Sequence, residues 1–269
     1  MSEENAASST AAASRFPQIR RIEASAIPRW LRAAWRDFCQ SSPASLFYGA
    51  AYAACGWLMH AVFSHAYALF AGLTTGFLLL GPFLTLGVSD LSRRIERGEQ
   101  PPHLGPTLAA WRPNLANVGL FAAVLAVVLL VWARASIVVF ALFFTGGLPT
   151  FADVVRTVLT FEQADFAIAY FGVGGFFAIF VFMISVIAMP LMLDRKTDAI
   201  TAAIASLFAC GRNPLPMLLW AACIALLGAI GFATLFLGLI VTIPLVGHAT
   251  WHAYRDLVVE EDAPSTTAS

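Results

Sequence analysis

The stretch Leu31-Arg32-Ala33-Ala34-Trp35-Arg36 begins a pattern that the chain uses three times. It opens an amphipathic segment that breaks at Pro43 and is followed by apolar sequence over residues 44–89. Because one membrane-spanning helix needs about 20 apolar residues, this run is long enough for two crossings. The same order returns through Leu108-Ala109-Ala110-Trp111-Arg112 before Pro113, and through Ser206-Leu207-Phe208-Ala209-Cys210-Gly211-Arg212 before Pro214. The pattern predicts an all-α protein, a polytopic membrane helix bundle of about six transmembrane helices in three parallel two-span repeats.

The composition indicates the same class of protein. Of the 269 residues, 59% are hydrophobic and 12% are charged, and the mean hydropathy is +0.77. A soluble domain carries about 25% charged residues, so this chain is expected in a lipid bilayer. The formal net charge is zero, which leaves no global field to attract nucleic acid. Residues 1–14 lack the basic start and the apolar core of a signal peptide.

The expected spans follow from the apolar runs. We expect them near residues 44–63 and 66–89, from 118 to beyond 131, and over 167–193. The last run, 215–254, is too long for one crossing, so we divide it around 231–238. The turn at this division would be almost wholly apolar, so its backbone groups must find partners inside the bundle or at the interface.

The remaining segments define the domain organisation. The amphipathic stretches 28–40, 104–112 and 198–211 are expected to lie flat on one leaflet as interfacial helices. Asp198, near the start of the third, suits the positive end of a helix dipole. We expect a disordered tail over 1–27, one membrane domain over 28–258, with repeats of about 28–99, 104–197 and 198–258, and a second disordered tail over 259–269.

The basic residues orient the chain. They gather before the first span, between the second and third, between the fourth and fifth, and after the sixth, whereas the loop 145–165 holds only Arg156 against three acidic residues. This bias predicts a bacterial inner-membrane protein with both termini in the cytoplasm. The tryptophans fit an aromatic belt, with one group at the inner ends of the spans (Trp30, Trp35, Trp111, Trp220, Trp251) and one near the outer ends (Trp57, Trp132).

Prolines and glycines within the spans are the first candidate functional positions. The second span of each repeat carries a proline (Pro82, Pro190, Pro244), and charged residues follow where the span ends. A proline in a membrane helix frees a carbonyl and kinks the helix, so these positions are possible hinges, although fixed helix shape for packing is the simpler interpretation. Gly72 and Gly76 form a G-x-x-x-G pair that favours close helix packing.

Titratable side chains give few candidates for chemistry. His248 and His252 are four residues apart on one helix face, a spacing that suits metal ligands, but no third ligand accompanies them. Hydrogen bonding to headgroups or neighbouring helices is the more common role of such a pair. The four cysteines form no C-x-x-C motif. Arg134, the one charge inside an apolar run, is a possible functional charge or a residue that snorkels to the interface. We therefore predict no cofactor, no bound metal and no catalytic residue.

Several runs resemble a known bacterial family. They are Gly81-Pro82-Phe83-Leu84 leading to Ser92-Arg93-Arg94-Ile95-Glu96-Arg97-Gly98-Glu99, then Val131-Trp132-Ala133-Arg134-Ala135, then Ala188-Met189-Pro190-Leu191 leading to Asp194-Arg195, and finally Arg212-Asn213-Pro214-Leu215-Pro216-Met217 continuing to residues 247–255. They are similar to predicted integral membrane proteins catalogued as a domain of unknown function, over about residues 22–259. The resemblance implies a multi-span inner-membrane protein without an established activity.

Members of that family are sometimes labelled cytochrome c oxidase subunit I. Such a subunit needs about twelve spans and about six histidine ligands buried at mid-membrane depth for its haems and copper. This chain has five histidines, and none lies at mid-depth in an expected span. The residues therefore argue against the label.

The sequence favours a non-enzymatic accessory, assembly or scaffold protein of the inner membrane. Its expected partners are membrane lipids, other inner-membrane proteins or a second copy, and not nucleic acid. The alternative is an uncoupled transporter or channel for a small or amphiphilic solute, because three parallel two-span repeats would be able to enclose a central path. A third class, a haem or metal enzyme using His248 and His252, has the least support. A transporter would line one shared cavity with polar residues, whereas a scaffold would have a filled core.

Overall fold

The computed structural model describes residues 16–63, 84–99, 103–143 and 164–259 of the chain. These residues are helical apart from turns, connecting segments and one short backbone bridge, which confirms the predicted all-α class. A helical segment without a label covers residues 84–96. The labelled elements are α2 (Ala26–Gln40), α3 (Ser42–Phe63), α5 (Leu104–Thr107), the 3₁₀ turn η1 (Arg112–Asn114), α6 (Leu115–Phe143), α8 (Ala164–Ser185), α9 (Ala188–Arg195), α10 (Ala199–Arg212), α11 (Pro214–Ala233) and α12 (Leu239–Leu257).

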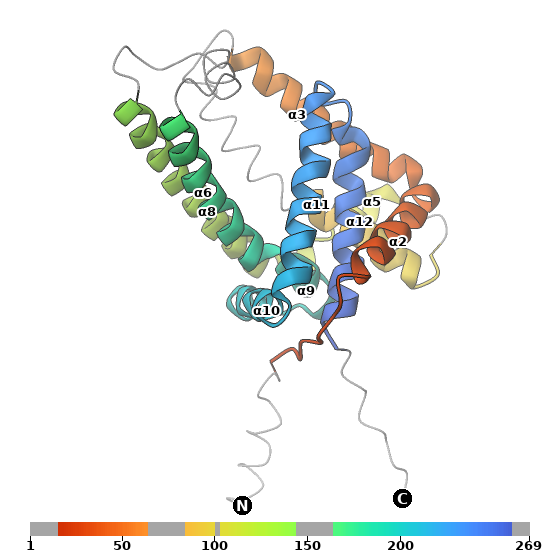
Figure 1. Ribbon diagram of the computed structural model, residues 1–269. Coiled ribbons are helices and arrows are strands. Elements are labelled where there is room, and N and C mark those ends of the chain that lie inside the picture. The colour runs from red at the N-terminus through yellow and green to blue at the C-terminus, as the bar shows by residue number, and fades with distance from the viewer. Residues whose placement is uncertain (1–15, 64–83, 100–102, 144–163, 260–269) are drawn as a thin grey trace, which may run out of the picture.

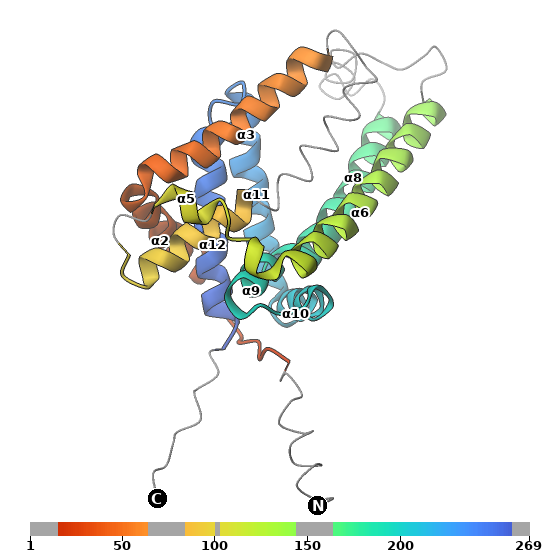
Figure 2. The same cartoon turned by 180° about the vertical axis from the view of Figure 1, so that it is seen from behind.

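The helices converge at one end of the molecule. Figure 1 shows α6 with α8 as one pair and α11 with α12 as another, and the pairs diverge away from the end where α9 and α10 lie. There α10 packs against α8 and α9, while α12 packs against α2, α3 and α11. Figure 2 shows from behind that the segment 84–96 crosses α12. We call the end that carries α9, α10 and the last turn of α12 the charged end.

The helices away from the charged end expose apolar side chains. Leu142 of α6, Ile168 of α8 and Leu218 of α11 are 72%, 71% and 62% exposed. Among the described residues, three stretches are long and apolar enough to cross a membrane, namely Leu104–Phe143, Ala164–Arg195 and Pro214–Ala233. A continuous apolar surface of this kind is stable against lipid and not against water. The chain is therefore a multi-pass integral membrane protein.

Proline starts a helix at each of the three sites where the sequence predicts a break. Pro43 is the second residue of α3, Pro113 lies in η1 directly before α6, and Pro214 is the first residue of α11. Proline suits the first turn of a helix because an amide hydrogen at this position would have no intrahelical acceptor, so its absence costs nothing. The amphipathic segments α2 and α10 therefore end, and the apolar helices begin, where the prolines dictate.

Two expected helices are interrupted. The stretch 104–112 is not one interfacial helix, because α5 ends at Thr107 and turns lead into η1. Pro113 has no N–H to donate to the carbonyl of Ala109, which instead accepts from the N–H of Arg112 in a tighter turn, so a regular α-helix does not continue here. The apolar run 167–193 is divided at residues 186–187 between α8 and α9, with Pro190 in the first turn of α9. At the break, Ser206 of α10 accepts a hydrogen bond from the backbone N–H of Ile187 at 3.4 Å.

The apolar turn between α11 and α12 has internal partners. Leu235 and Phe236 adopt left-handed backbone angles, with φ of 52° and 67°. The indole of Trp57 donates a hydrogen bond of 2.7 Å to the carbonyl of Leu235, and the N–H of Gly238 donates one of 2.7 Å to Thr234 Oγ1. The last apolar run thus divides at 234–238, within the range predicted from its length.

We expected a disordered tail over residues 1–27, and this expectation is wrong from residue 16 onward. Ile19 forms an antiparallel bridge with Val258, and the backbone N–H of Arg20 donates to Leu257 at 2.7 Å. Asn213 joins this segment to the corner between α10 and α11, because it accepts from the N–H of Ile22 and donates to the carbonyl of Arg20. Residues 16–25 are held by contacts nearly 200 residues away, which their polar local composition does not reveal.

Three of the five tryptophans assigned to the inner aromatic belt lie in the core. Trp30, Trp220 and Trp251 are at most 1% exposed, and Trp30 meets Trp220 edge to face at 5.8 Å. Trp35 and Trp57 are about half exposed, as an interfacial tryptophan should be. The core at the charged end is thus built around large aromatic side chains, so only part of the belt argument holds.

Candidate functional site

A fully buried histidine lies where α3, α12 and the segment 84–96 meet. His248 of α12 is 0% exposed. Its Nε2 lies 2.9 Å from the hydroxyl of Ser45 in α3, and its Nδ1 lies 2.8 Å from the hydroxyl of Ser92. Both ring nitrogens are therefore engaged by serines from two other helical segments.

An acidic side chain from α2 completes the arrangement. Asp37 is 7% exposed, and its Oδ2 accepts hydrogen bonds from Ser92 at 2.6 Å and from His252 Nε2 at 2.9 Å. The hydroxyl of Ser41, at the corner between α2 and α3, lies 2.8 Å from both the carbonyl oxygen of Asp37 and the hydroxyl of Ser45. We call these six residues the His248 cluster: Asp37, Ser41, Ser45, Ser92, His248 and His252.

The positions of the hydrogens follow from the chemistry of the partners. A carboxylate only accepts, so the hydroxyl of Ser92 donates its hydrogen to Asp37. Ser92 then accepts the hydrogen of His248 Nδ1, and the lone pair of Nε2 in a neutral ring accepts the one hydrogen of Ser45. The single hydrogen of Ser41 therefore goes either to the Asp37 carbonyl or to Ser45. The neutral imidazole is thus held in one tautomer by a one-way chain from Ser45 to Asp37.

Close backbone packing brings these side chains together. A Cβ atom on Gly49 of α3 would lie 2.0 Å from the carbonyl oxygen of Ile240, so only glycine fits there. This carbonyl is the one that Pro244, four residues later in α12, leaves without its helical N–H donor. A Cβ on Gly247 would likewise lie 2.6 Å from Val88. Small residues and the proline thus place α12 within hydrogen-bond reach of Ser45 and Ser92.

The centre of the cluster is closed to solvent, whereas the side chain of His252 at its edge is 26% exposed. Ser45, Ser92 and His248 are at most 1% exposed, and their polar side-chain atoms bond one another. The described residues include no group of three His, Cys, Asp or Glu side chains that would hold a metal ion. The arrangement joins the corner of α2 and α3 to the segment 84–96 and to α12. Its hydrogen bonds hold these helices together.

The charged residues that follow the second span of each repeat lie together beside this cluster. Asp90, fully buried, pairs with Arg93 and Arg94 of its own segment, and Arg93 also donates to the carbonyl of Leu193 at 2.9 Å. In α9, Asp194 accepts from the hydroxyl of Tyr254 in α12 at 2.8 Å. Burying polar and charged groups costs free energy unless they are paired in this way.

Glu96 connects the same elements through a second set of contacts. It accepts from the indole of Trp251 at 2.9 Å and from Arg255 Nε at 3.0 Å. Arg255 also lies 3.8 Å from Asp194. The ends of the segment 84–96, of α9 and of α12 are therefore joined by one network of ion pairs and hydrogen bonds.

Sequence reasoning found part of this site. His248 and His252 were singled out for their spacing, but Asp37, Ser41, Ser45 and Ser92 were missed. Asp37, Ser41 and Ser45 recur at intervals of four residues across the corner between α2 and α3, and of these Asp37 meets His252 and Ser45 meets His248. This regular spacing marks the two polar rows in the sequence, although it does not specify that they meet.

The other predicted positions are not members of the cluster, or they fall outside the described residues. Arg134 is exposed on α6. Pro190 and Pro244 are buried, the first in a new helix and the second inside α12. The proposed packing pair Gly72 and Gly76 and the proposed hinge Pro82 fall outside the residues that the structure describes.

Comparison with known proteins places the chain near one family. Residues 68–194 match a family model described as predicted integral membrane protein (DUF2189), which confirms the resemblance found in the sequence motifs. Ser92 and Asp194 lie within the matched range, whereas Asp37 and His248 lie outside it. No curated protein matches the chain. No solved structure matches it either.

Proposed function

We propose that this protein is a non-enzymatic accessory, assembly or scaffold component of a bacterial inner membrane. The observation that carries the proposal is the buried centre of the His248 cluster. A transporter needs polar groups from several helices around a shared cavity, and here polar groups from α2, α3, the segment 84–96 and α12 fill the shared space themselves. The rigid end that results is suited to holding helices and partners in a fixed arrangement.

The membrane arrangement belongs to the same proposal. We propose six spans in three parallel two-span repeats, with both termini and the charged end in the cytoplasm. The distribution of arginine along the chain supports this orientation, as does the position of the described chain ends, which leave the bundle together at the charged end (Figure 1). Alkaline phosphatase fused near Thr150 should then be active, and fused after Val259 inactive. Activity of the second fusion would mean that residues 215–254 do not cross twice.

Thiol accessibility separates the scaffold from a transporter. In a chain whose native cysteines are replaced, Ser45→Cys and Ser92→Cys should stay unmodified by a small, membrane-permeant thiol reagent, because both positions are buried. Modification of either position in the folded protein would indicate a solute path through the cluster and would favour the transporter.

The native cysteines supply matched controls for this experiment. Cys39 is exposed and should react in the otherwise cysteine-free chain. Cys210 is buried in α10, and burial raises the pKa of its thiol to about 11, so it should not react near neutral pH. A reagent that modifies Cys39 and spares Cys210 is therefore reporting burial.

Partners are tested by purification of the full chain in a mild detergent. Mass spectrometry of the co-purifying proteins and lipids should give a stoichiometric membrane partner, and the absorption spectrum should lack a haem band. A haem band would contradict the proposal, since it would restore the oxidase label that the histidine count argues against.

A further inference from the structure

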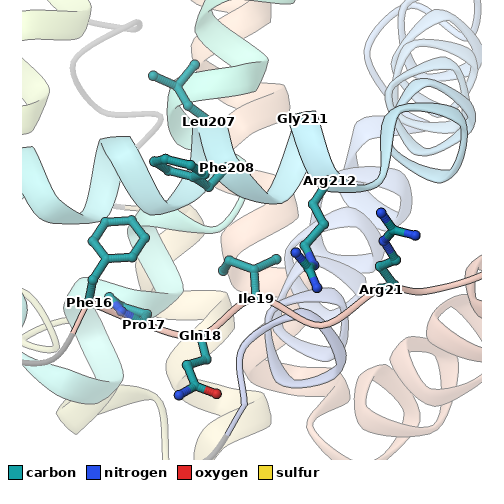
Figure 3. A pocket seen from close by; sticks show the side chains of 9 residues that line it. All are labelled: Phe16, Pro17, Gln18, Ile19, Arg21, Leu207, Phe208, Gly211 and Arg212. Carbon is teal, nitrogen blue, oxygen red and sulfur yellow. The ribbon is translucent and has the colours of Figure 1, made fainter.

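A groove runs between the N-terminal segment 16–21 and the last turns of α10, and it has two chemically different ends. Its volume is about 830 Å³. Figure 3 shows Arg21 and Arg212 at one end and the rings of Phe16 and Phe208 at the other. The two rings meet edge to face, with centroids 5.4 Å apart. The lining contains no acidic residue.

The two arginines differ from their neighbours at the charged end. Arg29, Arg93 and Arg255 each form an ion pair with an acidic side chain. Within the part of the chain that the structure describes, no ion pair or side-chain hydrogen bond is found for Arg21 or Arg212. Two guanidinium groups at one end of a groove without acidic residues are complementary to a negatively charged group, and arginine is well suited to phosphate.

The groove walls are held in place by the fold. Asn213, which is 2% exposed, directly follows Arg212 and bonds the backbone of both Arg20 and Ile22. The N–H of Val259 donates to the carbonyl of Gln18 at 3.0 Å on the other side of the segment. The segment 16–21 therefore forms a fixed wall opposite α10.

The position along the chain indicates a lipid. Arg212 lies two residues before α11, one of the candidate membrane spans, so its guanidinium is expected at headgroup depth. Phe208, one turn earlier, is 60% exposed and continues an outward apolar face of α10 with Ile200 and Ile204. A ligand that fits has a phosphate at the arginine end and hydrocarbon at the phenylalanine end.

We propose that this groove binds one anionic phospholipid, with its phosphate between Arg21 and Arg212 and an acyl chain against Phe16, Leu207 and Phe208. The inference rests on the proposed membrane setting and deepens it by naming a lipid class and a site. Two arginines near a lipid phosphate together account for about a 30-fold preference in binding, at roughly 1 kcal/mol each.

The test uses the full chain in a non-ionic detergent, freed of native lipid. Native mass spectrometry counts bound dioleoyl phosphatidylglycerol or dioleoyl phosphatidylcholine during titration. We expect tighter binding of phosphatidylglycerol, and an affinity about 30-fold lower in the double variant Arg21→Gln/Arg212→Gln. The matched control is Arg32→Gln/Arg36→Gln, which removes two exposed arginines of α2 and should leave the affinity nearly unchanged.

A third variant tests the groove itself while keeping both arginines. A Cβ on Gly211 would meet no atom within 4 Å, so Gly211→Leu should extend into open groove and block the lipid. Wild-type affinity for phosphatidylglycerol in Gly211→Leu would overturn the proposal. A loss of affinity in the α2 control as large as that in the double variant would overturn it as well. Competition by glycerol phosphate as strong as that by phosphatidylglycerol would indicate that the groove binds a soluble anion. A dimer that is lost in the groove variants would indicate that a second copy of the chain occupies the groove. Either result refutes the proposal of a bound lipid. None of these outcomes changes the thiol-accessibility result, so the two proposals fail separately.

Discussion

Replacing Ser92 by alanine is the sharpest test of the His248 cluster. The Ser92 hydroxyl donates to the Asp37 carboxylate at 2.6 Å and accepts from His248 Nδ1 at 2.8 Å. A hydrogen bond to a charged group contributes about 1.5–3 kcal/mol, and a buried donor left without a partner costs about 1–3 kcal/mol. Because the two effects share atoms and do not simply add, we expect Ser92→Ala to lower the free energy of unfolding by about 3 kcal/mol.

The segment 84–96 offers a matched control. Ser89 is also fully buried, but its Oγ has no hydrogen-bond partner among the described residues. The same change, Ser89→Ala, removes an unsatisfied hydroxyl and places a better helix former in the segment, so stability should stay equal or rise by about 0.5 kcal/mol. Ser45→Ala should fall between the two, since it leaves His248 with only an unsatisfied acceptor.

The assay is thermal unfolding of the three purified variants in one detergent, followed by loss of the monodisperse peak in size-exclusion chromatography. A loss of 3 kcal/mol corresponds to a decrease in Tm of roughly 6–12 °C for a chain of this size. If Ser92→Ala and Ser89→Ala unfold at the same temperature, the hydrogen bonds of Ser92 contribute no net stability. The conclusion that the hydrogen bonds of the cluster hold these helices together would then be refuted.

Four further changes test other parts of the structure, each by the same unfolding assay unless stated. Gly49→Ala should cost about 1–3 kcal/mol because its Cβ would lie 2.0 Å from the Ile240 carbonyl, whereas Gly228→Ala, with open space around it, should be neutral or stabilising. Trp57→Phe should cost about 1 kcal/mol by removing the bond to Leu235, and an unchanged Tm would mean that the turn does not need it. Arg134→Leu should cost about 1 kcal/mol or less if the exposed guanidinium only snorkels, and a large loss in both Arg134→Leu and Arg134→Lys would show that its geometry matters. Hydrogen bonds led by the backbone N–H of Thr201 lower the pKa of Asp198 below its ordinary 3.8, so this cap stabilises the fold above that pH and is lost on acidification. Asp198→Ala should therefore be less stable than wild type at pH 7, and the difference should shrink as the pH falls below 3.8 through the lowered pKa; a difference that stays constant over this acid range would contradict the titration.

The sequence determined the features that depend on local chemistry. The apolar composition placed the chain in a membrane, and the prolines at positions 43, 113 and 214 fixed where α3, α6 and α11 begin, because a proline stops one helix and suits the first turn of the next. The acidic residue Asp198 at the start of α10 was also predictable, since its contact to Thr201 is local, and the length of the last apolar run predicted that it divides. The spacing of His248 and His252 marked one face of α12 without saying what that face meets.

Only the tertiary structure decided the partners. Ser45 and His248 are 203 residues apart, and Asp37 and His252 are 215 apart, so nothing in either local sequence specifies the pairing. The tryptophans show the same limit, because the local pattern around Trp30 does not distinguish a ring that faces headgroups from one buried against Trp220. Helix formation depends on neighbours along the chain, whereas burial depends on which helix faces are brought into contact. In this protein the tight fit of Gly49 on the carbonyl that Pro244 sets free helps to bring those faces together.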